Sequence, residues 1–114
     1  MEEIDIEIYE TATGKRPFET WIKGLKEIRA RAKIMTRLDR MKLGNFGDCK
    51  SLQKGVFELR IHAGSGIRIY YGKIGNKIIL LLCGGDKGSQ DRDIAKAKEY
   101  LKDYQSRELK HGKK

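Results

Sequence analysis

Residues 56–83 carry the pattern that most constrains how this 114-residue chain can fold. Two segments that alternate apolar and polar residues, 56–63 and 67–74, are separated by Gly64-Ser65-Gly66, a sequence typical of a tight turn. The next segment, 77–83, is almost wholly apolar and does not alternate, as expected of a strand buried on both faces. The sequence therefore predicts an antiparallel hairpin beside a central strand.

The alternation assigns the hairpin side chains to two faces. The face expected to meet the core carries Phe57, Leu59, Ile61, Ala63, Ile67, Ile69 and Tyr71. Directly opposed residues of an antiparallel pair share a face, so the numbers of paired residues must add to an even value. A turn in the glycine-rich sequence then puts Arg60 opposite Arg68 or Tyr70. We expect Arg60, His62, Arg68 and Tyr70 to form one cluster on the face away from the core.

The segments before the hairpin predict a strand, two helices and a short strand. Residues 4–8 alternate with a period of two, as in a half-buried strand. Pro17 is well placed to begin a helix whose apolar spacing reaches Leu25, with a break expected near residues 24–27. A second helical pattern spans residues 28–41 and is stopped by a glycine. Residues 49–53 are a candidate short strand.

The C-terminal third predicts a connection, a helix and a tail. Residues 84–89, GGDKGS, lack the spacing of known phosphate-binding loops, and we expect a flexible connection that places Lys87 beside the end of the sheet. Ser89 or Asp91 is expected to cap a final helix with an apolar stripe. The sequence from Arg107 onward, RELKHGKK, is basic and is expected to fray.

These elements predict a single α+β domain over residues 1–114. The expected architecture is a small, twisted, mainly antiparallel sheet with two N-terminal helices and a C-terminal helix. Helices packed on one face would leave the other face of the sheet open.

Composition narrows the environment and the partners. Lys and Arg outnumber Asp and Glu by 25 to 16, and this net charge of +9 favours nucleic acid, then an acidic protein segment or anionic membrane, over charge for solubility alone. Cys49 and Cys83 form no CxxC pair, so we expect free thiols and no metal. The acidic N-terminal segment is no signal peptide, and the longest apolar run is too short for a membrane span. A cytoplasmic protein without cofactor is expected.

The arginine cluster and nearby Lys87 suit a phosphodiester. They also suit RNA cleavage in which the substrate's 2′-OH attacks, because that reaction needs cations around the phosphorane and groups that move protons. Arginine binds two phosphate oxygens and stays charged, so His62, Tyr70 or Lys87 would transfer protons. Alternatively, the arginines lie on a solvated face where Glu58 offsets one of them.

A second basic surface is expected to contact RNA phosphates. It lies on the second helix and around the short strand and consists of Lys33, Arg37, Arg40, Lys50 and Lys54. A solvated helix face explains its helical members equally well.

The sequences GVFELRIHAGSGIRIYYG (55–72) and IILLLCGGDKGSQDRDIAKAKEYL (78–101) resemble the RelE/ParE superfamily of type II toxin–antitoxin toxins. They are most similar to the branch of addiction-module killer proteins related to HigB. The resemblance extends to PFETWI and GNFGDCKSL and so covers nearly the whole chain. It implies the fold described above, an antitoxin partner with a helix-turn-helix DNA-binding domain, and ribosome-dependent cleavage of mRNA that arrests growth.

The resemblance also assigns residues. Arg68 corresponds to the catalytic strand arginine of RelE-like toxins, Arg60 matches another basic strand residue, and Lys87 lies near an arginine that follows their last strand. Glu58 occupies a position where those toxins carry lysine. Their proton-transferring tyrosine has no clear match near the start of the last helix, and Tyr70 or Tyr100 would be its substitute.

Three functions remain open from the sequence. The first is a ribosome-dependent mRNA endoribonuclease held inactive by its antitoxin. The second is a ParE-like inhibitor of DNA gyrase that acts by protein contact without nuclease chemistry, and the third is an inert prophage remnant that binds only its partner. The combination of Arg60, Arg68 and Lys87 favours the first, because gyrase inhibition needs no phosphate site.

Overall fold

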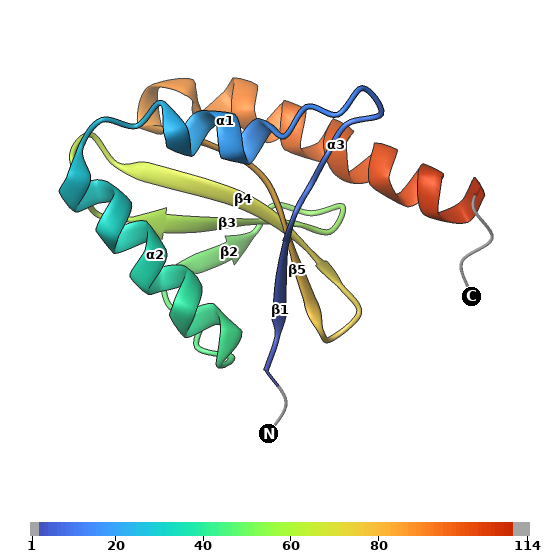
Figure 1. The fold of residues 1–114 in the computed structure, drawn as a ribbon, viewed down its shortest axis with the longest axis horizontal. Coiled ribbons are helices and arrows are strands. Elements are labelled where there is room, and N and C mark those ends of the chain that lie inside the picture. The colour runs from blue at the N-terminus through green and yellow to red at the C-terminus, as the bar shows by residue number, and fades with distance from the viewer. Residues whose placement is uncertain (1–2, 111–114) are drawn as a thin grey trace.

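The computed structural model describes residues 3–110. Its elements, in chain order, are β1 (Asp5–Ile8), α1 (Pro17–Lys23), α2 (Ile28–Lys42), β2 (Cys49–Ser51), β3 (Val56–Ile61), β4 (Ile67–Ile74), β5 (Ile78–Asp86), the 3-10 turn η1 (Lys87–Ser89) and α3 (Gln90–Lys110). This arrangement, drawn in Figure 1, confirms the predicted α+β class with two N-terminal helices and a C-terminal helix.

The five strands form one sheet in the order β1-β5-β4-β3-β2. β1 runs parallel to β5, and the other neighbouring strands are antiparallel. β5 therefore has a strand on each side, as its continuous apolar sequence predicts. The pairing of β4 with β5 shifts by one residue between Tyr70 and Tyr71, which marks an irregularity in the middle of the sheet.

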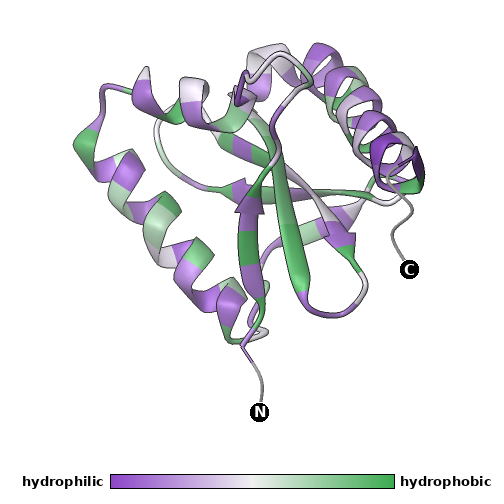
Figure 2. Cartoon of the chain, turned by 45° about the vertical axis from the view of Figure 1, so that its right-hand side comes forward, coloured by the Kyte–Doolittle hydropathy of each residue, from purple (hydrophilic) through white to green (hydrophobic). Residues whose placement is uncertain are grey.

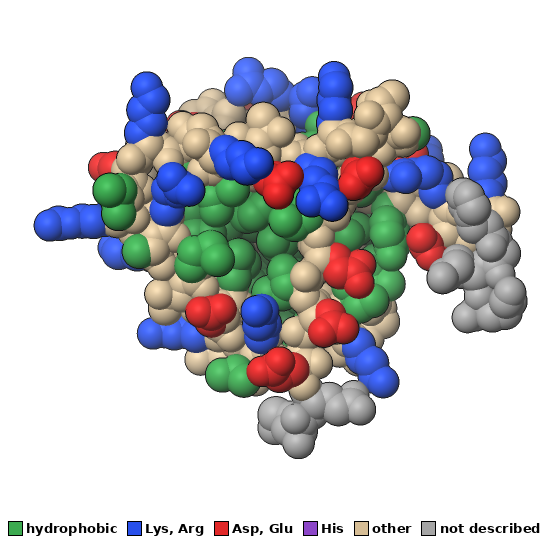
Figure 3. Space-filling model, in the orientation of Figure 1, with side chains coloured by type: hydrophobic (Ala, Val, Ile, Leu, Met, Phe, Trp, Pro, Cys, Tyr) green, Lys and Arg blue, Asp and Glu red, His purple; other side chains and the backbone are tan. Residues whose placement is uncertain are grey.

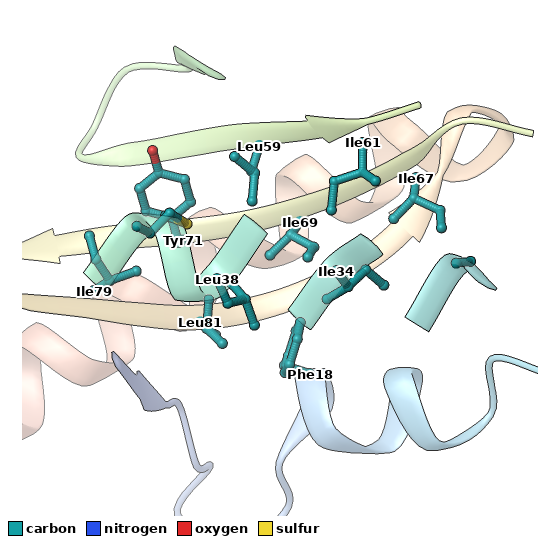
Figure 4. Close-up of a cluster of buried hydrophobic side chains, with 12 residues drawn as sticks. Phe18, Ile34, Leu38, Leu59, Ile61, Ile67, Ile69, Tyr71, Ile79 and Leu81 are labelled. Atoms are coloured by element: carbon teal, nitrogen blue, oxygen red, sulfur yellow. The ribbon is translucent and has the colours of Figure 1, made fainter. Parts of the chain in front are cut away.

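Helices cover both faces of the sheet, so the expectation of an open face is wrong. On one face, Ile34 and Leu38 of α2 lie over the strands (Figure 4), in a cluster that includes Phe18, Leu59, Ile61, Ile67, Ile69, Tyr71 and Leu81. On the other face, α3 contributes Ala97 and Leu101 to a second cluster with Val56, Tyr70, Leu80 and Leu82. The alternation in β3 and β4 separates these two cores because odd-numbered residues enter the first and even-numbered residues the second.

The GGDKGS sequence is not a flexible connection. β5 continues through Gly84 and Gly85 to Asp86. α1 packs against Gly84 on one face of the sheet, and α3 packs against Gly85 on the other. A Cβ on Gly84 would overlap with the ring of Trp21 in α1, and a Cβ on Gly85 would overlap with the carboxylate of Asp93 in α3. The pair of glycines is therefore required by close packing from both sides.

The 3-10 turn η1, which leads directly into α3, is capped by Asp86, and Ser89 takes part in this cap. The Asp86 carboxylate accepts hydrogen bonds from the backbone N–H groups of Gly88 and Ser89, at 2.9 and 3.2 Å. The Ser89 hydroxyl accepts a bond from the Asp86 N–H at 3.3 Å, which completes a capping box. This box turns the chain from β5 into α3 without a loop.

At its other end, α3 extends beyond the residue where fraying was expected. Residues 107–110 are helical, and Arg107 donates hydrogen bonds to the Asp103 carboxylate at 2.8 Å and to the Glu10 carbonyl at 2.6 Å. Tyr9 donates to the same carboxylate at 2.5 Å. These contacts fasten α3 to the segment after β1, while the rest of the predicted tail, 111–114, lies outside the described residues.

The face that carries α2 also contains an apolar groove. Figure 3 shows hydrophobic side chains in a hollow at the centre of this face, framed by charged side chains, and Figure 2 shows hydrophobic residues along the central strands. The groove has a volume of about 450 Å³ and is lined by apolar residues that include Ile6, Ile8, Phe18, Ile22, Met35, Leu38 and Leu81. Among the helices described, none, not even the 21-residue α3, has the length and apolar character needed to cross a membrane.

The packing at the two glycines predicts a large effect of one added methyl group. Gly84→Ala should lower the free energy of unfolding by about 1–3 kcal/mol, because Trp21 must move away from β5. Gly24→Ala is the matched control, since Gly24 has a φ of −82° and an added Cβ would lie 3.6 Å from its nearest neighbour. Urea unfolding of the two variants checks this, and an equal effect of both would contradict the packing described.

Candidate functional site

The register of the hairpin places the two strand arginines directly opposite each other. Arg60 of β3 pairs with Arg68 of β4, and Glu58 pairs with Tyr70. This is one of the two registers that the parity of the sequence allows. Two guanidinium groups at opposed positions repel each other, so the structure must supply a counter-charge.

Glu58 supplies that counter-charge from a fully buried position. Its side chain is 0% exposed, and its carboxylate accepts a hydrogen bond from Arg60 Nε at 3.2 Å, while Arg68 Nη1 lies 4.0 Å away. The same carboxylate accepts a bond from Gln90 Nε2 of α3 at 2.8 Å and faces the Tyr70 hydroxyl at 3.5 Å. One carboxylate thus organises groups from two strands and a helix.

The cluster is half-enclosed rather than spread on an open sheet. The side chain of Arg60 is 35% exposed and that of Arg68 only 15% exposed. Arg68 Nε is buried and has no hydrogen-bond partner within the described part of the chain. An unsatisfied buried donor is costly, and an anion can contact only the exposed part of this guanidinium unless the side chain moves.

The first turn of α3 forms the wall beside this cluster. Arg68 pairs across β4 and β5 with Gly85, and the carboxylate of Asp93 lies where a Gly85 side chain would be. Lys87 is exposed in η1 and its Cβ lies 3.8 Å from the Cβ position of Gly66, at the start of β4. The structure thus places Lys87 at the end of the sheet, next to the strand that carries Arg68.

The two other predicted catalytic residues differ in accessibility. Tyr70 is 0% exposed, and burial, followed by the charge of Glu58, raises the pKa of its phenol well above the usual 10.0. In this structure Tyr70 can neither reach a substrate nor act as a base near neutral pH. The side chain of His62 is 85% exposed, and its Nε2 lies 3.2 Å from Asp48 Oδ2 instead of facing the arginines.

Part of the predicted phosphate-binding surface is used inside the fold. Arg37 Nη1 donates to the backbone carbonyl of Arg60 at 2.7 Å, its Nη2 donates to that of Phe46 at 3.2 Å, and Lys33 Nζ donates to that of His62 at 3.0 Å. The bonds to Arg60 and His62 connect α2 to the end of β3, and the bond to Phe46 connects it to the loop before β2. The remaining members of the predicted surface, Arg40, Lys50 and Lys54, are exposed.

Sequence reasoning missed the central place of Glu58. The sequence does indicate that Glu58 lies near Arg60, because both are even-numbered residues of β3 and therefore lie on the same face of the strand. Its burial could not be read from the strand itself, since it results from α3 and Gln90 covering this face. Within residues 3–110, no group of three His, Cys, Asp or Glu side chains is arranged to hold a metal ion.

The fold and the site define a small basic α+β domain with paired arginines around a buried carboxylate. The chain belongs to the family described as "Phage derived protein Gp49-like (DUF891)", whose sequence model matches residues 20–102. It is similar to an uncharacterized protein of Haemophilus influenzae, with 51% identity over 81 residues that cover 71% of this chain and 82% of that protein. The Gp49-like family is associated with the toxins of toxin–antitoxin systems.

Glu58 should therefore be required for stability. Glu58→Gln removes the charge that two guanidinium groups share, and we expect it to lower the free energy of unfolding by about 1–3 kcal/mol. Glu7→Gln, an exposed residue of β1, is the matched control and should change stability by less than about 0.5 kcal/mol. Chemical denaturation measures both, and a Glu58→Gln protein as stable as the control would contradict the proposed organisation.

The tyrosines give a second test of the packing. All five tyrosines have a pKa raised above 10.0, mainly by burial, and that of Tyr9 reaches about 12. The native state therefore holds phenolic protons that the unfolded chain loses near pH 10, and stability should fall as the pH rises from about 10 toward 12. Ultraviolet titration should show native phenols ionising later than those of the protein in denaturant. Coincident titration curves would contradict this.

Proposed function

We propose that this chain is the toxin of a type II toxin–antitoxin pair and acts as a metal-independent endoribonuclease on mRNA bound to the ribosome. The observation that carries the proposal is the direct opposition of Arg60 and Arg68 around the buried Glu58. The association of the Gp49-like family with toxins supports it. The resemblance of the hairpin sequence to RelE-like toxins is a second argument for it.

The proposed reaction is attack of a ribose 2′-OH on the adjacent phosphodiester. The nucleophile belongs to the substrate, so the protein has to neutralise charge on the pentacovalent phosphorane and move protons. Arg68, whose side chain is 15% exposed, would bind the phosphate, and Arg60, whose side chain is 35% exposed, would bind it from the neighbouring strand. Lys87, exposed beside the strand that carries Arg68, is the candidate for proton transfer. His62 would first have to leave Asp48, and Tyr70 is buried with its hydroxyl on Glu58.

The partners of the proposed toxin are a helix-turn-helix antitoxin, the ribosome and mRNA. The net charge of +9 and the exposed Arg40, Lys50 and Lys54 suit contact with RNA phosphates. The apolar groove between β1, α1 and α2 is the surface we assign to the antitoxin, because burying it requires a protein partner.

Arg68→Ala tests the proposed function. It removes a charged donor that acts on the transition state, and such losses lower catalytic rates by about 100- to 1,000-fold. We expect induction of this variant to cause no growth arrest, while co-purification with the antitoxin is retained because the apolar groove is untouched. Arg29→Ala, an exposed cation of α2, is the matched control and should still arrest growth. Full arrest by Arg68→Ala would exclude the assignment.

A ParE-like inhibitor of DNA gyrase is the alternative, and one observation favours it. Each strand arginine already has the Glu58 carboxylate within 4.0 Å, so the pair could serve the fold alone. Mapping mRNA 5′ ends after brief induction separates the two functions. New ends within codons support cleavage, and an SOS response without new ends supports gyrase.

A further inference from the structure

An open cleft lies at the end of the sheet, where β5 leads into η1 and α3. Figure 1 shows that the α1–α2 connection, the β3–β4 turn and the start of α3 meet at this end. The cleft has a volume of about 590 Å³, and its lining includes Trp21, Glu27, Gly64, Gly85 and Arg92. This volume is within the range of about 300–1,000 Å³ typical of small-molecule sites.

The cleft is open because the sheet is incomplete at this point. β1 pairs with β5 only from Asp5–Ile78 to Ile8–Leu81, so within the described residues the last part of β5 is paired with β4 on one side and has no strand on the β1 side. α1 and the first turn of α3 approach this free edge from the two faces of the sheet, over Gly84 and Gly85. The result is a slot with an aromatic wall on one side and polar groups on the other.

The aromatic wall is Trp21, the only tryptophan of the chain. It is half-buried, since its ring packs over Gly84 and lies 5.7 Å from the ring of Phe18, yet it lines the cleft. A tryptophan fixed in this way has no need to reorder when a planar ligand stacks on it. Stacking on aromatic side chains is a common way for proteins to hold single-stranded RNA bases.

Of the three carboxylates at the cleft, one is available to a ligand. The carboxylate of Asp86 is used by the backbone N–H groups of η1, and that of Asp93 accepts a hydrogen bond from the Ser89 hydroxyl at 2.5 Å. Glu27, at the N-cap of α2, is exposed and makes neither a side-chain hydrogen bond nor an ion pair with any described residue. Its Oε1 lies 3.3 Å from the Cβ position of Gly64, at the mouth of the cleft.

We propose that this cleft binds a guanine base of an RNA strand, an inference that rests on the proposed function. Guanine is the base whose Watson–Crick edge offers two adjacent donors, N1–H and the N2 amino group, and a carboxylate accepts both. Adenine and cytosine have an acceptor beside their amino group, and uracil has one N–H between two carbonyls. None of these three bases offers two adjacent donors to the Glu27 carboxylate. Trp21 stacks on the base, and Arg92 lies at the cleft to meet a phosphate.

The position of the cleft gives it a role in choosing where RNA is cut. Gly85, in its wall, pairs with Arg68, and the Lys87 Cβ lies 3.8 Å from the Cβ position of Gly66, just before β4. A nucleotide with its base in the cleft would therefore place a neighbouring phosphate toward the arginine pair. The cleft would act as a specificity site next to the phosphate site.

The single tryptophan makes binding directly measurable. Purified protein is titrated with GMP, AMP, CMP and UMP while the fluorescence of Trp21 is recorded. We expect a saturable change with GMP at the lowest concentration, and about tenfold weaker GMP binding by Glu27→Gln, with loss of the preference over AMP. Glu19→Gln, an acidic residue of α1 outside the cleft, is the matched control and should bind GMP like the unchanged protein. Equal responses to all four nucleotides, or an unaltered GMP preference in Glu27→Gln, would overturn the inference.

The failure of this inference can be told apart from failure of the proposed function. Arg68→Ala leaves the cleft lining intact and should retain the fluorescence response to GMP. Cleavage of mRNA without any preference for guanine beside the cut would exclude the proposed guanine site and support the proposed nuclease activity. GMP binding by a protein that cuts no mRNA would exclude the proposed nuclease activity and support the proposed guanine site.

Discussion

The buried carboxylate of Glu58 is the interaction on which the rest of this structure depends. It joins β3 through Arg60, β4 through Arg68 and α3 through Gln90, and its side chain has no exposed surface. A charge taken out of water is tolerated only where several donors surround it. The position of α3 and the geometry of the arginine pair are therefore set by the same group.

The glycine pair at the end of β5 extends this organisation to both faces of the sheet. Trp21 approaches one face at Gly84, and Asp93 approaches the other at Gly85. Because no side chain intervenes, α1 and α3 come close to the free edge of β5 and form the two sides of the cleft. The arginine pair and the cleft thus lie next to each other at the end of β5.

Much of the fold could be predicted from the sequence because its patterns are local. Alternation in β3 and β4 identified the strands, their two faces and the permitted registers, and the apolar run of β5 indicated a central strand. The face taken by α3 could not be predicted, since its apolar stripe fits either side of a sheet. The double glycine predicts a flexible connection because glycine weakens strands in general, whereas here it allows two helices to pack closely against β5.

The candidate site was predictable only in part for the same reason. Strand parity brought Arg60, Arg68 and Tyr70 together, but accessibility depends on what covers them. α3 buries Tyr70 and Glu58 while Arg68 keeps a small exposed fraction, and His62 turns to Asp48 beyond the end of β3. Long-range packing therefore decides which members of the cluster can meet a substrate.

The central claim, that the arginine pair serves cleavage by a 2′-OH, is tested most directly by the chemical ends of the RNA product. Purified protein is added to ribosomes carrying a defined mRNA, and the fragments are analysed for their terminal groups. Attack by the 2′-OH predicts an upstream fragment ending in a 2′,3′-cyclic phosphate and a downstream fragment beginning with a 5′-hydroxyl. Intact mRNA, or fragments beginning with a 5′-phosphate, would contradict the account.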